Sequence, residues 1–289
     1  MNGAFTSETT LSQLTEYPGF RPFGRLLLPL DRDYFRGNTL GDLSLAWYSN
    51  IRAETTMEVA NYLKTHADQG ERIFIDFYSP EEKKTDPTKA DTGLFFFRGN
   101  KGGKFAVVSP GGGMVYTGSI HDSFPQALEL SKRGCNAFAL VYRPGWQSGP
   151  YDLLRAVDHI IRHAEELGVD DSDYSLWGGS AGARIAAMVG TWGEESGLPR
   201  PAAVILQYNG YSEVTGREPP TYSCVGSLDG ISSPAVMARR TERLKVRGVP
   251  AEIEIFEGLS HGFGLGRGTV AENWLDHAVD FWRRQMKNS

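Results

Sequence analysis

Short apolar segments alternate with longer amphipathic segments from about residue 72 to the end of the chain, and this alternation constrains the fold most. The apolar segments have strand length, and they cover residues 72–78, 93–97, 104–109, 136–142, 174–177, 202–207, 221–225 and 251–256. Helical spacing of apolar residues marks residues 124–133, 151–167, 181–192, 233–246 and 270–286. Several strands are apolar at every position, which is typical of a mostly parallel sheet covered by helices on both faces. The pattern therefore predicts an α/β fold, in which ligands bind at the carboxyl ends of strands.

The first 70 residues lack this alternation. Residues 1–50 are rich in aromatic side chains and interrupted by prolines, and residues 53–63 have a helical pattern. Further along the chain, residues 81–92 form a polar stretch that we expect to be a loop. We predict that residues 1–70 are an N-terminal extension that packs on the body and is a candidate cover for the active site. Residues 71–289 then form the catalytic domain.

Composition excludes several classes of protein. A formal net charge of −5 disfavours nucleic acid as a partner, because nucleic-acid binding needs a basic face. No apolar run reaches the length of a membrane span, and no signal peptide is recognisable, so we expect a cytoplasmic protein without membrane contact. Cys135 and Cys224 are too few for a disulfide framework. His159 and His163 share one helix face, but no third metal ligand is near, so no metal site is predicted.

The segment 178–182 has the pattern Gly-x-Ser-x-Gly between a short strand and a helix of small residues. In this setting the serine lies on a sharp turn that only glycine neighbours allow, and its hydroxyl projects above the sheet. We therefore predict Ser180 as the nucleophile. The same pattern recurs around Ser260, but no helix of small residues follows there, so Ser260 is rejected. A tight turn without chemistry is the alternative reading of the motif.

Three glycines, Gly111 to Gly113, follow the apolar strand at 104–109. Such a loop can bring backbone amides close to a developing negative charge. The candidate oxyanion-hole donors are the amides of Gly112, Gly113 and Ala181. A phosphate-binding loop is disfavoured because the Gly-Lys-Ser/Thr element is missing, and a simple flexible turn is the remaining alternative.

One histidine lies in a glycine-bracketed loop after the last strand, where a base facing the nucleophile belongs. This residue is His261, and Asp229 follows the preceding strand. The order Ser180, Asp229, His261 is the order in which an α/β-hydrolase supplies nucleophile, orienting acid and base. Glu213 and Glu218 lie before that strand and are poorer candidates for the acid.

Taken together, these motifs resemble the α/β-hydrolase superfamily, and most of all the acetyl esterase/lipase-type carboxylesterases near the hormone-sensitive lipase group. The resemblance covers about residues 72–286, and it rests on residues 110–113, 141–144, 178–182, 226–229 and 258–261. It implies an eight-stranded sheet and cofactor-free hydrolysis of small esters. It also implies that Tyr142-Arg143 supports the oxyanion loop. Pro110 stands where that family usually has histidine, and residues 208–220 are too short to hold a large lid.

The resulting hypothesis is a serine hydrolase that cleaves short-chain, acetyl-type carboxylic esters through Ser180, His261 and Asp229 and an acyl-enzyme. Its partner would be a small-molecule ester, with an acetylated sugar as one candidate, and a homodimer remains open. Two alternatives are a peptidase of the same fold and a non-catalytic binding protein that keeps the fold.

Overall fold

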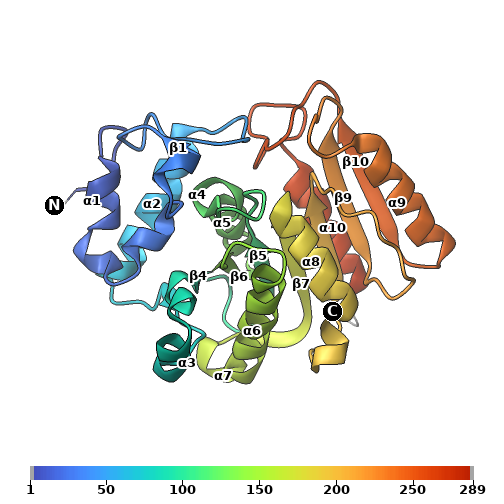
Figure 1. Ribbon diagram of the computed structural model, residues 1–289, viewed down its shortest axis with the longest axis horizontal. Helices are drawn as coiled ribbons and strands as arrows, with labels where there is room; N and C mark the ends of the chain where they lie inside the picture. The colour runs from blue at the N-terminus through green and yellow to red at the C-terminus, as the bar shows by residue number, and fades with distance from the viewer. Residues whose placement is uncertain (1–2, 287–289) are drawn as a thin grey trace.

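The computed structural model describes residues 3–286, and a sheet of eight strands forms its centre (Figure 1). The strands lie in the order β10-β9-β8-β7-β5-β6-β4-β3. Their bounds are β3 Phe74–Ile75, β4 Gly93–Phe97, β5 Lys104–Ser109, β6 Asn136–Val141, β7 Asp170–Gly179, β8 Ala203–Gln207, β9 Thr221–Gly226 and β10 Ala251–Phe256. β4 runs antiparallel to β3 and β6, and the remaining neighbours are parallel. The α/β class and the mostly parallel eight-stranded sheet are thus confirmed.

Parallel pairing places the carboxyl ends of the central strands along one edge of the sheet. β5 ends just before Pro110, and β7 ends just before Ser180. β9 and β10 pair over their full length, so the loops that carry Asp229 and His261 leave the sheet side by side. Segments far apart in the sequence therefore meet at this edge.

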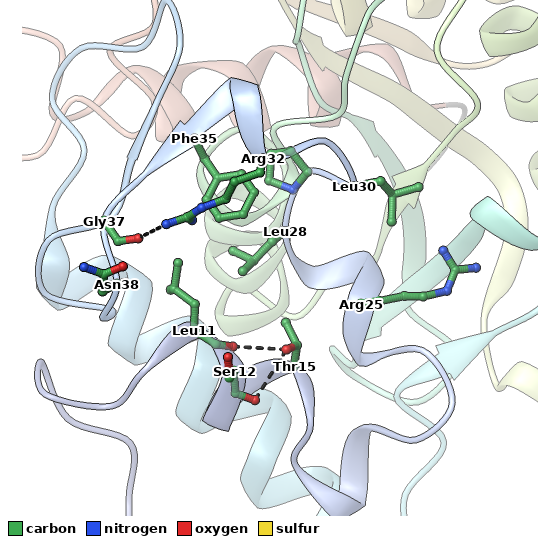
Figure 2. A pocket seen from close by; sticks show the side chains of 11 residues that line it. Leu11, Ser12, Thr15, Arg25, Leu28, Leu30, Arg32, Phe35, Gly37 and Asn38 are labelled. Carbon is green, nitrogen blue, oxygen red and sulfur yellow. Dashed lines mark hydrogen bonds between the residues drawn. The ribbon is translucent and has the colours of Figure 1, made fainter.

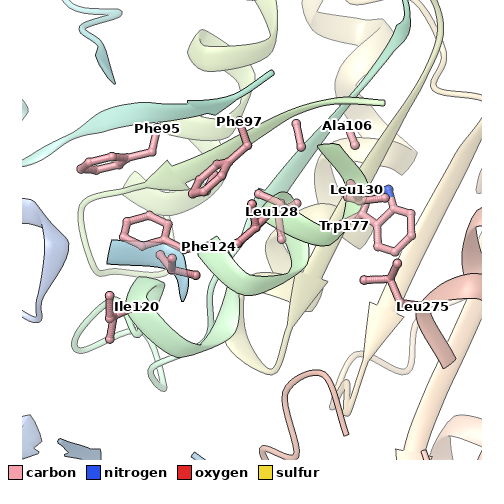
Figure 3. Packing of buried hydrophobic residues seen from close by; sticks show 14 of the residues in the cluster. Phe95, Phe97, Ala106, Ile120, Phe124, Leu128, Leu130, Trp177 and Leu275 are labelled. Atoms are coloured by element: carbon pink, nitrogen blue, oxygen red, sulfur yellow. The ribbon is translucent and has the colours of Figure 1, made fainter. Parts of the chain in front are cut away.

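Helices cover both faces of the sheet, as predicted. The main helices are α2 Ala53–Asp68, α5 Phe124–Lys132, α6 Ser148–Arg162, α8 Ala181–Trp192, α9 Pro234–Val246 and α10 Trp274–Gln285. Successive side chains of a strand point to opposite faces. In β4, Phe95 and Phe97 pack toward α5 with Phe124 (Figure 3), whereas Leu94 and Phe96 belong to the cluster that includes α6 and α8. The sheet therefore lies between two hydrophobic layers.

The polar stretch at 81–92, expected as a loop, is largely helical, so this prediction was wrong. It contains α3 Pro80–Thr85 and a 3-10 helix at Pro87–Asp91. Ser79 accepts a hydrogen bond from the Glu82 amide, and the Glu82 side chain accepts one from the Ser79 amide. This capping box is a local signal that the sequence already contains.

The helix expected at 151–167 starts earlier, at Ser148, and is interrupted at His163. The backbone of His163 has φ −115° and ψ 20°, and a short helix, α7 Ala164–Leu167, follows. The strand expected at 72–78 is also shorter, because only Phe74–Ile75 pairs with β4 at the edge of the sheet. Ile73 and Ile75 would share one face of a regular strand, but here they lie in different hydrophobic clusters.

The N-terminal segment, residues 3–52, consists of short turns and one small hairpin. It contains α1 Leu11–Thr15, 3-10 turns at Pro18–Phe20, Gly24–Leu27 and Arg32–Tyr34, and the paired strands β1 Phe35–Arg36 and β2 Ser44–Leu45. Its buried apolar residues join the cluster on the α5 face of the sheet. In Figure 1 its blue ribbon crosses the top of the molecule toward the loop that follows β10.

None of the helices between residues 3 and 286 is both long and apolar enough to cross a membrane.

Candidate active site

Ser180 lies on the sharp turn between β7 and α8. Its backbone has φ +52° and ψ −117°, a conformation that non-glycine residues rarely adopt, and its amide donates to the carbonyl of Gln207 at 2.9 Å. The flanking glycines have a steric cause. A Cβ on Gly178 would lie 2.4 Å from the backbone of Gly182, and a Cβ on Gly182 would lie 2.1 Å from the carbonyl oxygen of Ser109. The turn thus has the geometry expected for a nucleophile elbow.

The structure brings Ser180, His261 and Asp229 together in one hydrogen-bonded chain. His261 Nε2 lies 3.0 Å from Ser180 Oγ, and His261 Nδ1 lies 2.8 Å from Asp229 Oδ2. The other carboxylate oxygen, Oδ1, accepts from the amides of Ile231 and Ser232 at 2.8 and 2.7 Å. These two amides fix the carboxylate, which leaves Oδ2 facing the imidazole. Both His261 and Asp229 are buried, so little water competes for these bonds.

The glycine loop after β5 presents unpaired amides. The carbonyl of Gly111 accepts from the Gly118 amide at 2.9 Å, and the carbonyl of Gly112 accepts from the Val115 amide at 3.1 Å. In residues 3–286 no acceptor is bonded to the amides of Gly112 and Gly113, which belong to the same two peptide units. Gly112 has φ +136°, and a Cβ there would lie 2.1 Å from the carbonyl oxygen of Tyr116. Only glycine fits this position without strain.

Ala181 supplies a third free amide. It is the first residue of α8, so its N–H has no partner inside the helix. The carbonyl of Ser180, in the same peptide unit, accepts from the Arg184 amide at 3.2 Å. The amide also lies at the positive end of the helix dipole, which favours a negative charge at this point.

A cavity of about 330 Å³ opens over these groups. Its lining comes from five parts of the chain and consists of Trp47, Tyr48, Gly112, Gly113, Ser180, Ile231 and His261. Trp47 and Ile231 form apolar walls and are 50% and 59% exposed. The Trp47 ring packs on the oxyanion loop, since a Cβ on Gly113 would lie 2.8 Å from it. The space beside Ser180 therefore suits a small and mainly apolar group.

The residues rejected from sequence lie outside this cavity. Ser260 is exposed in the turn after β10. Glu213 accepts from the hydroxyl of Tyr211 at 3.0 Å, and Glu218 is buried against the amides of Thr215 and Gly216. Neither glutamate contacts His261, so the acid beside the imidazole is Asp229.

Four residues of the site were missed from sequence: Trp47, Tyr48, Asp122 and Ile231. Trp47 and Tyr48 lie in a segment without a recognisable motif, and no local signal could have placed them at the pocket. Asp122 lies nine residues after the last glycine of the loop. The closeness of this carboxylate to the glycine loop was the available signal.

A larger cavity, of about 420 Å³, lies in the N-terminal segment away from Ser180 (Figure 2). Its two cationic side chains are already engaged. Arg25 pairs with Asp91 at 2.6 Å, and the Arg32 guanidinium donates to the Gly37 carbonyl at 2.5 Å. The hydroxyls of Ser12 and Thr15 also line this space, but no histidine or acidic side chain lies among its lining residues to activate them, so we assign it no chemistry.

Across residues 3–286, no group of three or more His, Cys, Asp or Glu side chains is arranged to hold a metal ion. His159 and His163 stack on each other with ring centroids 4.2 Å apart. Burial lowers the pKa of His159 to about 4, and the nearby charge of His163 acts in the same direction.

The order of the strands and the helices on both faces are those of the α/β-hydrolase fold, and comparison with solved structures agrees. An acetyl ester-xyloside bifunctional hydrolase from Caldicellulosiruptor lactoaceticus superposes with a TM-score of 0.63 at 22% identity, over 73% of this chain and 95% of that one. A thermophilic esterase from Thermogutta terrifontis with bound propionate gives 0.61 at 22% identity, over 75% and 96%. An α/β-hydrolase enzyme from a Medee basin deep-sea metagenome library gives 0.58 at 20% identity, over 67% and 92%. At these identities the likeness establishes the fold.

The BD-FAE family model matches residues 124–215. This range runs from α5 past the end of β8, and it includes Ser180 but neither Asp229 nor His261. No curated protein matches the sequence.

Proposed function

We propose that this protein is a serine hydrolase of short-chain carboxylic esters. The observation that carries the proposal is the hydrogen-bonded chain from Ser180 Oγ through His261 to Asp229, placed beside three unpaired amides. A nucleophile, a base and an oxyanion hole at one point are the parts that acyl transfer needs. Solved neighbours named as esterases, one of them with propionate bound, support an ester substrate.

In the first half-reaction, Ser180 Oγ attacks the ester carbonyl carbon while His261 Nε2 accepts the hydroxyl proton. The carbonyl oxygen becomes an oxyanion that accepts from the amides of Gly112, Gly113 and Ala181. Asp229 holds the Nδ1–H tautomer and stabilises the imidazolium. Collapse of the intermediate breaks the bond to the alcohol oxygen, which takes the proton from His261 and leaves an acyl-enzyme.

In the second half-reaction, water replaces the alcohol. The oxygen of this water attacks the acyl carbon while His261 accepts one of the water's protons. The oxyanion forms again in the same place. Its collapse breaks the bond to Ser180 Oγ, which regains the proton from His261, and the carboxylic acid leaves.

The size of the cavity argues for small substrates. About 330 Å³ beside Ser180, with Trp47 and Ile231 as walls, suits a short acyl chain and part of an alcohol. Each buried CH₂ contributes about 0.8 kcal/mol, so kcat/KM should rise with chain length only until the cavity is full. We expect the optimum at roughly two to six carbons.

We propose acetylated sugars as the natural substrates, so that the alcohol part of the ester is a sugar. Trp146, in the loop after β6, is 63% exposed, and the guanidinium of Arg184 lies 4.9 Å from its ring centroid. Arg184 follows Ser180 by one helical turn, and helical side chains lean toward the N-terminus of their helix. An exposed indole braced by an arginine one helical turn from Ser180 is a surface on which a sugar ring can stack.

The test of the proposal is a panel of p-nitrophenyl esters from acetate to palmitate, a peracetylated xylose and a peptide p-nitroanilide. We expect hydrolysis of the acetate and of the acetylated sugar, a decline beyond about six carbons, and no cleavage of the peptide. Cleavage of the peptide without ester hydrolysis would support a peptidase instead.

The proposed role of Trp146 in binding a sugar can be tested against a control tryptophan on α8, the helix that carries Arg184. Trp146→Ala should lower kcat/KM for acetylated xylose about ten-fold relative to p-nitrophenyl acetate, since one stacking contact is lost. Trp192 lies at the far end of α8, and the guanidinium of Arg217 lies 4.7 Å from its ring centroid, as that of Arg184 does beside Trp146. Trp192→Ala should leave this ratio unchanged. Equal ratios in both variants would remove Trp146 from the substrate site.

A further inference from the structure

Asp122 is a buried carboxylate directly behind the oxyanion loop and the nucleophile turn. It ends the short helix α4 Ser119–Asp122 and is 1% exposed. Its Oδ2 accepts from the Gly111 amide at 2.7 Å and from the Tyr48 hydroxyl at 2.8 Å, and its Oδ1 accepts from the Tyr208 hydroxyl. A Cβ on Gly179 would collide with the carboxylate. One side chain therefore joins the oxyanion loop, the N-terminal segment and the loop after β8.

The hydrogen bond to Gly111 acts on the oxyanion amides. The peptide unit between Pro110 and Gly111 is held at both ends, because its N–H donates to Asp122 and its carbonyl accepts from the Tyr142 hydroxyl at 2.8 Å. The carbonyl of the following unit is held by the Gly118 amide. With these peptide planes fixed, the next N–H, that of Gly112, has one direction left, toward the pocket.

The residues beside Asp122 and Tyr48 hold the base loop. Ser49 donates from its hydroxyl to the His261 carbonyl at 2.7 Å and from its amide to the Gly262 carbonyl at 3.2 Å. His121 Nε2 lies 3.2 Å from the same Gly262 carbonyl. Burial lowers the pKa of His121 to about 4, so a neutral imidazole donates this bond. The oxyanion loop and the base loop are thus both held by neighbouring residues of two segments, namely Tyr48, Ser49, His121 and Asp122.

We propose that Asp122 is a positioning residue that, together with Tyr48 of the N-terminal segment, sets the oxyanion hole against the base. The proposal rests on the esterase function proposed above. It also makes the N-terminal segment part of the catalytic apparatus, although none of its residues takes part in the chemical steps.

The environment of Asp122 adds a signature in the pH profile. Burial raises the pKa of Asp122 to about 6, against the hydrogen bonds from Tyr208, Gly111 and Tyr48 and the charge of His261, which lower it. Tyr48 and Tyr208 stay protonated, since burial and the Asp122 charge raise the pKa of both phenols. As the pH falls through about 6, protonation removes the negative charge of Asp122 and turns one of its oxygens into a donor, which weakens the three hydrogen bonds that the carboxylate accepts. We therefore expect protonation of Asp122 to lower kcat/KM as the pH falls through about 6.

The experiment compares Asp122→Ala, Asp122→Asn and Tyr48→Phe in the full chain. Because small misplacements of reacting groups are costly, we expect kcat for p-nitrophenyl acetate to fall about 100-fold, 10-fold and 5-fold respectively, with KM within about two-fold. The side-chain oxygen of asparagine can still accept from the Gly111 amide, so the loss of kcat is smaller in Asp122→Asn than in Asp122→Ala. Asp122→Ala and the double variant with Tyr48→Phe should be equally slow, because both remove one network. Tyr17→Phe is the matched control, since Tyr17 also donates to an aspartate, Asp68, but far from the pocket.

Two readouts separate positioning from loss of fold. The affinity for a trifluoromethyl ketone, whose adduct places an oxyanion in the hole, should fall by the same factor as kcat/KM in each variant. The decline of kcat/KM as the pH falls through about 6 should be steeper in the wild type than in Asp122→Asn, because only the wild type has the Asp122 carboxylate to protonate. Near-uv circular dichroism checks that each variant is folded.

Unchanged ketone affinity in a folded Asp122→Ala, or equal activity of Tyr48→Phe and Tyr17→Phe, would overturn the positioning role alone. A wild type that hydrolyses no ester would overturn the proposed function, and the positioning role with it.

Discussion

The N-terminal segment and the strand-end loops meet at one pocket but reach it by different routes. Ser180, Asp229 and His261 each follow a strand, so the parallel sheet alone brings them together. Trp47 and Tyr48 belong to no regular element, and their place depends on aromatic contacts with distant residues, such as the 5.7 Å between the rings of Trp47 and Tyr116. We infer that the strand-end loops supply the chemistry, whereas the segment supplies shape and alignment. Substitutions in the loops should then abolish activity, and those in the segment should modulate it.

The largest effect is expected at Ser180. Ser180→Ala should lower kcat about 10⁶-fold or to background, because the members of a triad act as a unit. Ser260→Ala is the control, since this serine lies in the same sequence pattern but is exposed after β10. The activity of both variants is measured as burst and steady-state rates of p-nitrophenyl acetate hydrolysis. Equal losses in the two variants would leave the choice of nucleophile without support.

Asp229→Asn should cost about 10⁴-fold in kcat, because the amide favours the wrong imidazole tautomer. The fold should persist, since the amide oxygen can still accept from the amides of Ile231 and Ser232. Glu213→Gln, with its partner Tyr211 outside the site, should change kcat less than about two-fold. Near-normal turnover of Asp229→Asn would place the orienting acid elsewhere.

Gly112→Ala should lower kcat by about 10²–10³-fold, the usual loss for one oxyanion donor. The new Cβ would lie 2.1 Å from the Tyr116 carbonyl, so the loop must shift. Gly102→Ala is a control for strain alone, because Gly102 also has a positive φ, +71°, with no atom near its Cβ position. If both variants lose the same activity, backbone strain rather than the oxyanion hole explains the result.

A smaller effect than at the strand-end loops is expected at Trp47, which lies in the N-terminal segment. Trp47→Ala removes one apolar wall of the pocket, so kcat/KM should fall about ten-fold while kcat changes less than about three-fold. The preference for short acyl chains should also flatten. A loss in kcat as large as that of Gly112→Ala would show that Trp47 itself does more than shape the pocket.

The same difference explains what the sequence could predict. The order of strands and helices and the glycines around Ser180 are local signals, and the parallel sheet follows from them. Asp229 and His261 could be placed by their position after strands, and the structure puts them within hydrogen-bonding distance of each other and of Ser180. Tyr48 could not be placed, because its bond to Asp122 spans 74 residues and depends on how an irregular segment packs. The helix α3 could have been predicted from its Ser79–Glu82 capping box but was read as a loop for its polarity.

The central claim is that Ser180 is the nucleophile of an ester hydrolase, and active-site labelling tests it most directly. The wild type would be treated with a fluorophosphonate, and the intact mass and the modified peptide would be read by mass spectrometry. We predict one adduct per chain, on Ser180, formed in step with the loss of p-nitrophenyl acetate hydrolysis and absent in Ser180→Ala. An adduct on Ser260, or a protein that hydrolyses esters while Ser180 stays unlabelled, would contradict the account.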